Sequence, residues 1–170
     1  MDKVERFVQI NGSNFHIFES KNTLINNFIL ELKQKLPSST YLAVVDGKAV
    51  SNLDELFKTF SDAFQFPDYF GNNWAAFDEC INDLDWLEAS SYILVLKDVE
   101  KMLSNEQYFG ILIKTLYQTV NEWRNGRMYD SFPTPPTPFH IIFEVGVNKG
   151  NEFKNRLKAE GVQDIEILSI

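Results

Sequence analysis

The sequence of 170 residues contains few cysteines and histidines, the residues that disulfides and many catalytic or metal sites require. It contains one cysteine, Cys80, and two histidines, His16 and His140. A lone cysteine excludes an internal disulfide framework and favours a reducing compartment, so we expect a cytoplasmic protein. No apolar run is longer than five residues, as at 41–45, and the charged start leads into no secretory apolar segment. We therefore expect neither a membrane span nor a membrane partner.

Recognisable cofactor and metal motifs are also missing. The sequence has no GxGxxG, GxxxxGK[ST], HExxH or CxxC pattern. Both histidines fall within expected strands with no second ligand or positioned partner nearby, which favours a structural role over catalysis. Cys80 lies among apolar positions without a basic neighbour, so we expect a small buried hydrophobic residue. The sequence predicts no cofactor, no metal and no enzyme activity.

The composition is that of a packed, acidic domain. Hydrophobic residues make up 44% of the chain, and it contains 15 Phe. The 16 Lys and Arg against 24 Asp and Glu give a formal net charge of −8. This charge argues against direct binding of nucleic acid and suits a basic partner.

Strand and helix patterns alternate along most of the chain. Continuous apolar runs, typical of strands covered on both faces, predict strands at 41–45, 92–96, 139–145 and 165–170. Helical spacing predicts helices at 23–36, 51–64, 73–84, 105–123 and 151–160. The alternation predicts an α/β fold with a central, mainly parallel sheet flanked by helices.

The first 40 residues are expected to form an N-terminal extension. Asn11-Gly12 is a strong tight-turn signal, so residues 8–19 are predicted to form a β-hairpin that precedes the first helix. These elements precede the first continuous apolar strand, at 41–45.

The charge is concentrated in one stretch. Between Lys58 and Lys97 there is no Lys or Arg, but there are seven acids. These acids are Asp62, Asp68, Asp78, Glu79, Asp83, Asp85 and Glu88.

A helix capped by Asn72 or Asn73 is expected to carry part of this charge. Its positions Trp74, Phe77, Ile81 and Leu84 have helical spacing and predict the buried stripe. The residues left towards the other side are Ala75, Asp78, Glu79, Asn82 and Asp83. Carboxylates beside the aromatic residues Tyr69 and Phe70 are typical of a footprint for a basic protein surface. The alternative is a solvated helix face with two core aromatics.

An enzyme that uses paired carboxylates is the competing chemical interpretation. Asp78 and Glu79 are adjacent, and adjacent helix residues point about 100° apart, so they form no close dyad. No polarising Lys or Arg lies nearby in the sequence. A solvated acidic face is therefore favoured over catalysis.

Residues 67–74 (PDYFGNNW) and 77–87 (FDECINDLDWL) closely resemble the core motif of the barstar family, the intracellular inhibitors of barnase-type ribonucleases. Similarity to family strands and helices extends the resemblance over 41–100 and 151–170. The resemblance implies a barstar-like domain over 41–170 with an insertion at about 101–150.

The resemblance also implies an immunity-type inhibitor that blocks a basic ribonuclease toxin through an acidic helix face. Tyr69 stands where the family has its contacting loop aromatic, and Glu79 where it has its chief acid. The implied contact residues are Tyr69, Phe70, Asn73, Asp78, Glu79 and Asp83.

Three positions depart from the family pattern. Ala75 replaces a supporting aspartate, and Arg156 aligns with a glutamate of the last family helix. Asp78 stands where an aromatic residue usually precedes the chief acid. These departures favour a toxin or protein target other than barnase. The alternative function is therefore a barstar-like module that binds an unrelated protein partner.

Overall fold

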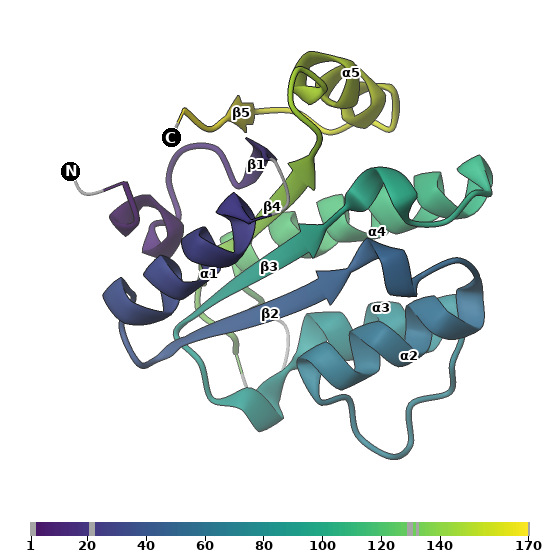
Figure 1. Cartoon of the computed structure of the whole chain (residues 1–170). Helices are drawn as coiled ribbons and strands as arrows, with labels where there is room; N and C mark the ends of the chain where they lie inside the picture. Colours follow the sequence, from purple (N-terminus) through teal and green to yellow (C-terminus); the bar gives the residue numbers. More distant parts are fainter. Residues whose placement is uncertain (1–2, 21–22, 129–130, 132, 170) are drawn as a thin grey trace.

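A computed structural model describes residues 3–20, 23–128, 131 and 133–169. Its centre is a five-stranded sheet in the order β2-β3-β4-β1-β5, and every ladder in that sheet is parallel (Figure 1). The strands are β1 (Phe15–Glu19), β2 (Thr40–Asp46), β3 (Ser91–Lys97), β4 (Phe139–Val145) and β5 (Ile165–Ile167). The predicted α/β fold with a parallel sheet is confirmed.

Five α-helices flank the sheet: α1 (Leu24–Lys35), α2 (Leu53–Phe64), α3 (Trp74–Asp83), α4 (Glu106–Asn125) and α5 (Gly150–Ala159). Short 3-10 helices are η1 (Glu5–Val8), η2 (Gly47–Ala49), η3 (Asp85–Leu87) and η4 (Val99–Lys101). Each predicted helix is present, with ends that differ by at most two residues from those predicted.

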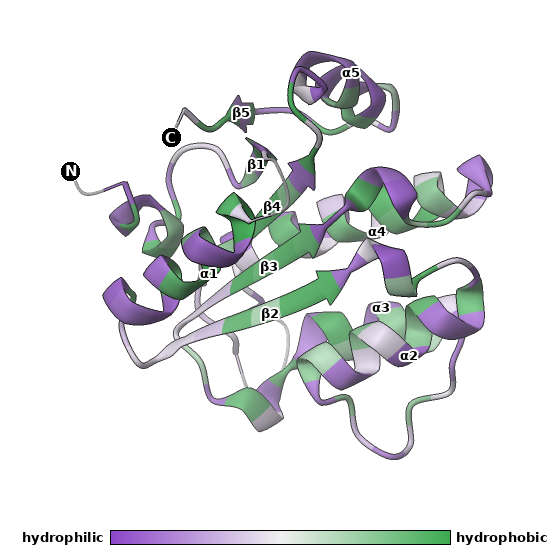
Figure 2. Ribbon diagram, in the orientation of Figure 1, coloured by the Kyte–Doolittle hydropathy of each residue, from purple (hydrophilic) through white to green (hydrophobic). Residues whose placement is uncertain are grey.

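The sheet is covered on both faces, which explains its continuous apolar strands (Figure 2). Leu94 and Leu96 of β3 belong to the larger core, which α2, α3, α4 and α5 cover. Ile93 and Val95 of the same strand point into a smaller core under α1 and η1. Successive side chains of a strand face opposite ways, so one run of apolar residues supplies both cores.

The predicted β-hairpin over residues 8–19 is wrong. Residues Glu5–Val8 form η1, and β1 lies inside the sheet, parallel to both β4 and β5. Gly12 does turn the chain, with a φ of +96°. However, Ile17 and Phe18 are buried on opposite faces, and a strand that is apolar on both sides is more stable between two other strands than at the edge of a hairpin.

Candidate protein-binding face

The loop before α3 and the first turn of α3 are held by local hydrogen bonds. Asn73 Oδ1 accepts from the Ala76 backbone N–H at 2.9 Å, and Asn73 Nδ2 donates to the Gly71 carbonyl at 3.1 Å. The Phe70 N–H donates to the Pro67 carbonyl at 2.9 Å. Asn73 is therefore the N-cap that the sequence predicted, and it fixes the direction in which α3 leaves the loop.

The inner side of α3 packs into the larger core. Phe77 and Ile81 have no exposed surface, and Cys80 is 3% exposed. Burial raises the pKa of the Cys80 thiol, and the carboxylates of Glu79 and Asp83 raise it further. Cys80 is thus the inert buried residue that the sequence predicted.

Three residues are placed differently from the expected faces. Trp74 is only half-buried, with its ring edge-on to Phe57 at 5.2 Å between ring centres. Phe70 points inwards and is 9% exposed, so the structure does not present it on the acidic side. Asn82 is buried and donates from Nδ2 to the Asp78 carbonyl, at 2.9 Å. The inner surface of α3 therefore reaches further around the helix than its apolar residues indicate.

The outer side of α3 presents a set of exposed side chains that we call the acidic face. Its aromatic member, Tyr69, is 70% exposed. The other members are the exposed residues Asp78, Glu79, Asp83 and Asp85. Asn73, at the start of the helix, is also exposed. Five of the six predicted contact residues are thus exposed on this loop–helix unit, and Asp85, which the same acidic stretch of sequence contains, is exposed near Asp83.

Electrostatic interactions tie the members of the acidic face together. Partial desolvation raises the pKa of the Tyr69 phenol, and the carboxylates of Asp83, Asp85 and Glu79 raise it further. Partial desolvation and the Asp85 carboxylate also raise the pKa of Asp83, against the opposing effect of Arg127. The carboxylates of Glu79, Asp83 and Asp85 therefore lie near enough to Tyr69 to interact with it.

Helix α4 supports this surface from behind. Trp123 donates from its indole Nε1 to the Ile81 carbonyl at 3.1 Å. Arg127 pairs with Glu122 at 3.0 Å and borders Asp83. Sequence reasoning missed Arg127, because it lies more than 40 residues from Asp83 and follows the end of another helix.

Arg156, the second departure from the family pattern, lies on α5. Its guanidinium donates two hydrogen bonds of 2.9 Å to the carboxylate of Glu106 on α4. It also lies over the Phe109 ring, at 3.7 Å from the ring centre. Arg156 therefore stabilises the packing of α5 on α4.

The two histidines form a buried pair on neighbouring strands. His16 Nε2 lies 3.0 Å from His140 Nδ1, and each residue is 1% exposed. Burial lowers the pKa of His140 to about 4 and lowers that of His16 well below its ordinary value. Phe7 packs edge-on against both rings. The carboxylate oxygen Oε2 of Glu166 lies 3.2 Å from His16 Nδ1. This enclosure supports the structural role expected for both residues.

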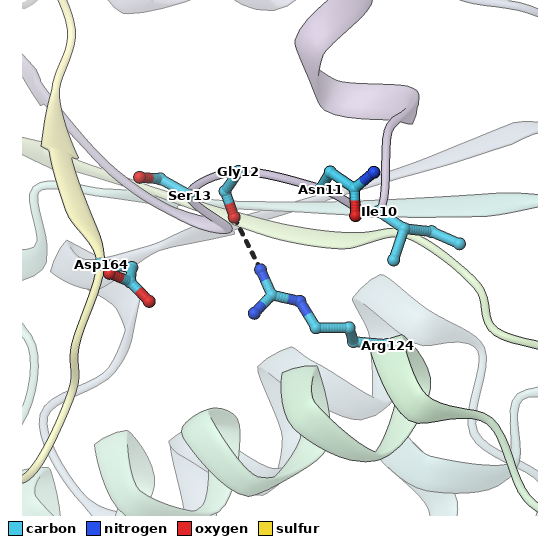
Figure 3. A pocket seen from close by; sticks show the side chains of 6 residues that line it. All are labelled: Ile10, Asn11, Gly12, Ser13, Arg124 and Asp164. Carbon is cyan, nitrogen blue, oxygen red and sulfur yellow. Dashed lines mark hydrogen bonds between the residues drawn. The ribbon is translucent and has the colours of Figure 1, made fainter.

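A cavity of about 470 Å³ lies at the amino-terminal ends of β1 and β5 (Figure 3). It is lined by Ile10, Asn11, Gly12, Ser13, Arg124 and Asp164. Arg124 donates to the Gly12 carbonyl at 2.6 Å and to Asn14 Oδ1. The Arg124 side chain therefore tethers the loop before β1 to α4.

Neither a metal site nor a membrane helix emerges from the described residues. Among them, no three His, Cys, Asp or Glu side chains are grouped so as to hold a metal ion. No helix in that part of the chain is both long and apolar enough to cross a bilayer.

One protein-family model, described as Barstar (barnase inhibitor), matches residues 40–132. The match covers more than half of the chain and includes α2, α3 and α4. The match includes residues 101–132, which the resemblance to the family had implied to be part of an insertion. It ends before residues 151–170, which the resemblance had included. No curated protein matches the chain.

Solved structures resemble the chain in fold alone. Cdc6p from Pyrobaculum aerophilum has a TM-score of 0.61 and 12% identity, over 98% of this chain and 42% of its own. The ORC2 protein of Aeropyrum pernix, solved as ADPNP-ADP complexes, has a TM-score of 0.55 and 11% identity, over 97% and 44%. Drosophila ORC bound to AT-rich DNA and Cdc6 has a TM-score of 0.50 and 15% identity, over 94% and 49%. The chain spans less than half the length of each of these chains.

Proposed function

Because the chain belongs to the barstar family, a family of ribonuclease inhibitors, we propose that it binds and blocks a basic ribonuclease toxin through the acidic face of α3. The toxin, the residues in contact and the action inside a cell are all parts of this proposal. The observation that carries it is a set of exposed carboxylates that form no ion pair among the described residues, on a helix that Asn73 caps and Trp123 contacts.

The acidic face carries uncompensated charge. Within the described residues, none of Asp78, Glu79, Asp83 and Asp85 forms an ion pair. Glu79 and Asp83 are four residues apart on α3, so their like charges share one face and mildly destabilise the free helix. A basic partner would relieve this repulsion, and the negative potential would speed its approach.

The proposed mechanism is occlusion combined with mimicry of phosphate. A ribonuclease holds the RNA backbone with Arg and Lys side chains, and these groups bind carboxylates with the same donors. Glu79 would enter the phosphate site, with Asp83 beside it one helical turn later. Tyr69, exposed on a loop whose ends are hydrogen-bonded, would supply a rigid aromatic contact at low cost in side-chain entropy.

Ala75 shifts the expected contacts along the helix. A methyl group there removes the carboxylate that the family places one turn before Glu79. Asp83 and Asp85 instead extend the charge towards the end of α3. We infer a ribonuclease whose basic residues match this shifted pattern, and not barnase.

A module for an unrelated basic protein is the second candidate, and the same departure at Ala75 favours it. The two candidates differ in one measurable consequence. An inhibitor abolishes RNA cleavage by its bound partner at one equivalent, whereas a module of another kind leaves the partner's chemistry unaffected.

The test is capture of partners on the immobilised chain, followed by an assay of RNA cleavage by each captured protein. We expect a basic ribonuclease that the wild-type chain inhibits and that Glu79→Gln inhibits far less. Glu31→Gln, which removes one exposed charge from α1, is the matched control and should inhibit like wild type. Capture of a partner with no nuclease activity, or equal inhibition by Glu79→Gln, would contradict the proposal.

A further inference from the structure

A second cavity, of about 190 Å³, lies at the opposite edge of the sheet from the cavity beside Arg124. It is lined mainly by residues that end β1, β3 and β4 or follow them. Its polar lining residues are Ser20, Asp98, Glu100, Lys101, Glu144 and Gly146. None of these residues belongs to the acidic face, so a ligand site in this cavity would be independent of the proposed function.

The position of this cavity follows from the topology of the sheet. Neighbouring strands β1 and β4 are followed by α1 and α5. Helix α1 packs in the smaller core and α5 in the larger one, so the chain leaves the two strands towards opposite faces (Figure 1). A crevice forms outside the carboxyl ends of such a strand pair, and open α/β sheets bind their ligands there.

The first unusual group in the cavity is a buried carboxylate. Glu144 is 4% exposed, and its Oε2 accepts from the Asp98 backbone N–H at 2.9 Å. In the part of the chain that the structure describes, no Lys or Arg pairs with it. Burying a carboxylate without a cation costs desolvation free energy, and a positively charged ligand in the cavity would offset that cost at Glu144.

The second unusual group is a buried hydroxyl. Ser20 is 6% exposed, and its Oγ has no hydrogen-bond partner among the residues that the structure describes. Its backbone N–H donates to the Val145 carbonyl at 3.0 Å, which fixes the residue against the end of β4. Buried polar atoms are almost always paired, so the free Oγ indicates a ligand atom.

The remaining charged groups around the cavity leave Glu144 without a cation. Asp98 is neutralised by Lys101 at 3.0 Å and Lys48 at 3.3 Å. Glu100 accepts from the Gly146 N–H at 2.8 Å, and it lies near enough to Lys149 to raise the pKa of that ammonium group. Glu144 inside the cavity and Glu100 at the exposed rim both keep carboxylate oxygens that can accept from a ligand.

We propose that this cavity binds a small primary amine in its ammonium form, with Glu144 and Ser20 as inner acceptors and Glu100 as a third acceptor at the rim. An ammonium group has three N–H donors, and three acceptor side chains line this one cavity. A volume of 190 Å³ corresponds to about six water molecules at about 30 Å³ each. An alkyl amine or diamine of about six heavy atoms fits this space.

The same residues oppose the other ligand classes. A metal ion is disfavoured because no three acidic, His or Cys side chains of the described chain are grouped to hold one. A phosphate is disfavoured because the start of α5 is already occupied: the Gly150 N–H donates to Glu19 Oε1 at 2.7 Å. A Cβ at Gly150 would come within 2.4 Å of that oxygen, so the carboxylate leaves no room for an anion there.

The test is titration calorimetry of the full chain with putrescine. Wild type should bind one equivalent, and Glu144→Gln, whose amide oxygen can still accept from Asp98, should bind at least 10-fold more weakly. Ser20→Ala should weaken binding several-fold, while the matched control Glu31→Gln should bind like wild type. Tetramethylputrescine, which keeps one N–H on each ammonium group, should bind at least 10-fold more weakly than putrescine.

Circular dichroism at the titration temperature verifies that each variant is folded. If Glu144→Gln is unfolded, Ser20→Ala and the methylated amine decide the question. No binding of putrescine to wild type at 10 mM, equal binding by the folded variants, or equal binding of the methylated amine would overturn the proposal. Binding of Mg²⁺ without binding of putrescine would also overturn it.

Discussion

Trp123 on α4 donates its indole N–H to the backbone carbonyl of Ile81 in the last turns of α3, at 3.1 Å. The bond lies two residues before Asp83, so it fixes the end of the helix that carries the acidic face. At the other end, Asn73 caps the first turn. A face held at both ends loses little conformational freedom when a partner binds.

Loss of the Trp123 bond should therefore destabilise the protein. Trp123→Phe keeps most of the ring but leaves the Ile81 carbonyl without its indole donor. We expect the free energy of unfolding in urea to fall by about 1–3 kcal/mol. A loss below about 0.5 kcal/mol would show that the bond contributes little to the position of α3.

The two aromatic residues at the start of α3 should differ in their effect on stability. Phe77 is fully buried, so Phe77→Ala should cost about 3–5 kcal/mol. Trp74 is half-buried, so Trp74→Ala should cost less than Phe77→Ala when both are measured by urea unfolding at one pH. An equal or larger cost for Trp74→Ala would contradict the observed packing.

Stability should fall in mild acid because of the buried histidine pair. Burial lowers the pKa of His140 to about 4, so at pH 5 the folded form keeps the imidazole neutral while the unfolded chain protonates it. The stabilisation is complete above the ordinary pKa of 6.5 and declines as the pH falls towards 4. From pH 7 to pH 5 this one residue should cost about 2 kcal/mol.

The measurement is the change in unfolding free energy between pH 7 and pH 5 for wild type and for His140→Gln. Carboxylates contribute equally to both proteins, so the difference between the two changes reports the His140 imidazole together with its electrostatic effect on His16. His140→Gln should lose about 2 kcal/mol less than wild type. Parallel pH profiles would mean that folding does not lower the pKa of His140.

Local sequence patterns predicted the helices and strands of this fold better than they predicted which strands pair with each other. The apolar runs at 92–96 and 139–145 specify strands covered on both faces, and β3 and β4 are such strands. Asn11-Gly12 does specify a turn, but a turn signal carries no information about which strand lies beside β1. That choice depends on burying Ile17 and Phe18 on opposite faces, which is a long-range requirement.

The same distinction holds for the candidate sites. The N-cap at Asn73 and the exposure of Glu79 follow from spacing along one helix. The inward position of Phe70 and the burial of Asn82 depend on α2, α4 and the sheet, which helix spacing does not describe. The cavity between Ser20 and Glu144 joins positions that are 124 residues apart, so no local pattern marks it.

Binding of a basic ribonuclease through the acidic face can be tested by measuring affinity and the salt dependence of association. The direct measurement is titration calorimetry of wild type, Glu79→Ala, Tyr69→Ala and Glu31→Gln with the captured basic ribonuclease. Glu79→Ala should weaken binding by about 2–5 kcal/mol, mainly through faster dissociation, and Glu31→Gln should have no effect. Higher salt should slow association of the wild-type chain. Unchanged affinity in folded Glu79→Ala and Tyr69→Ala would contradict the account and exclude α3 as the binding face.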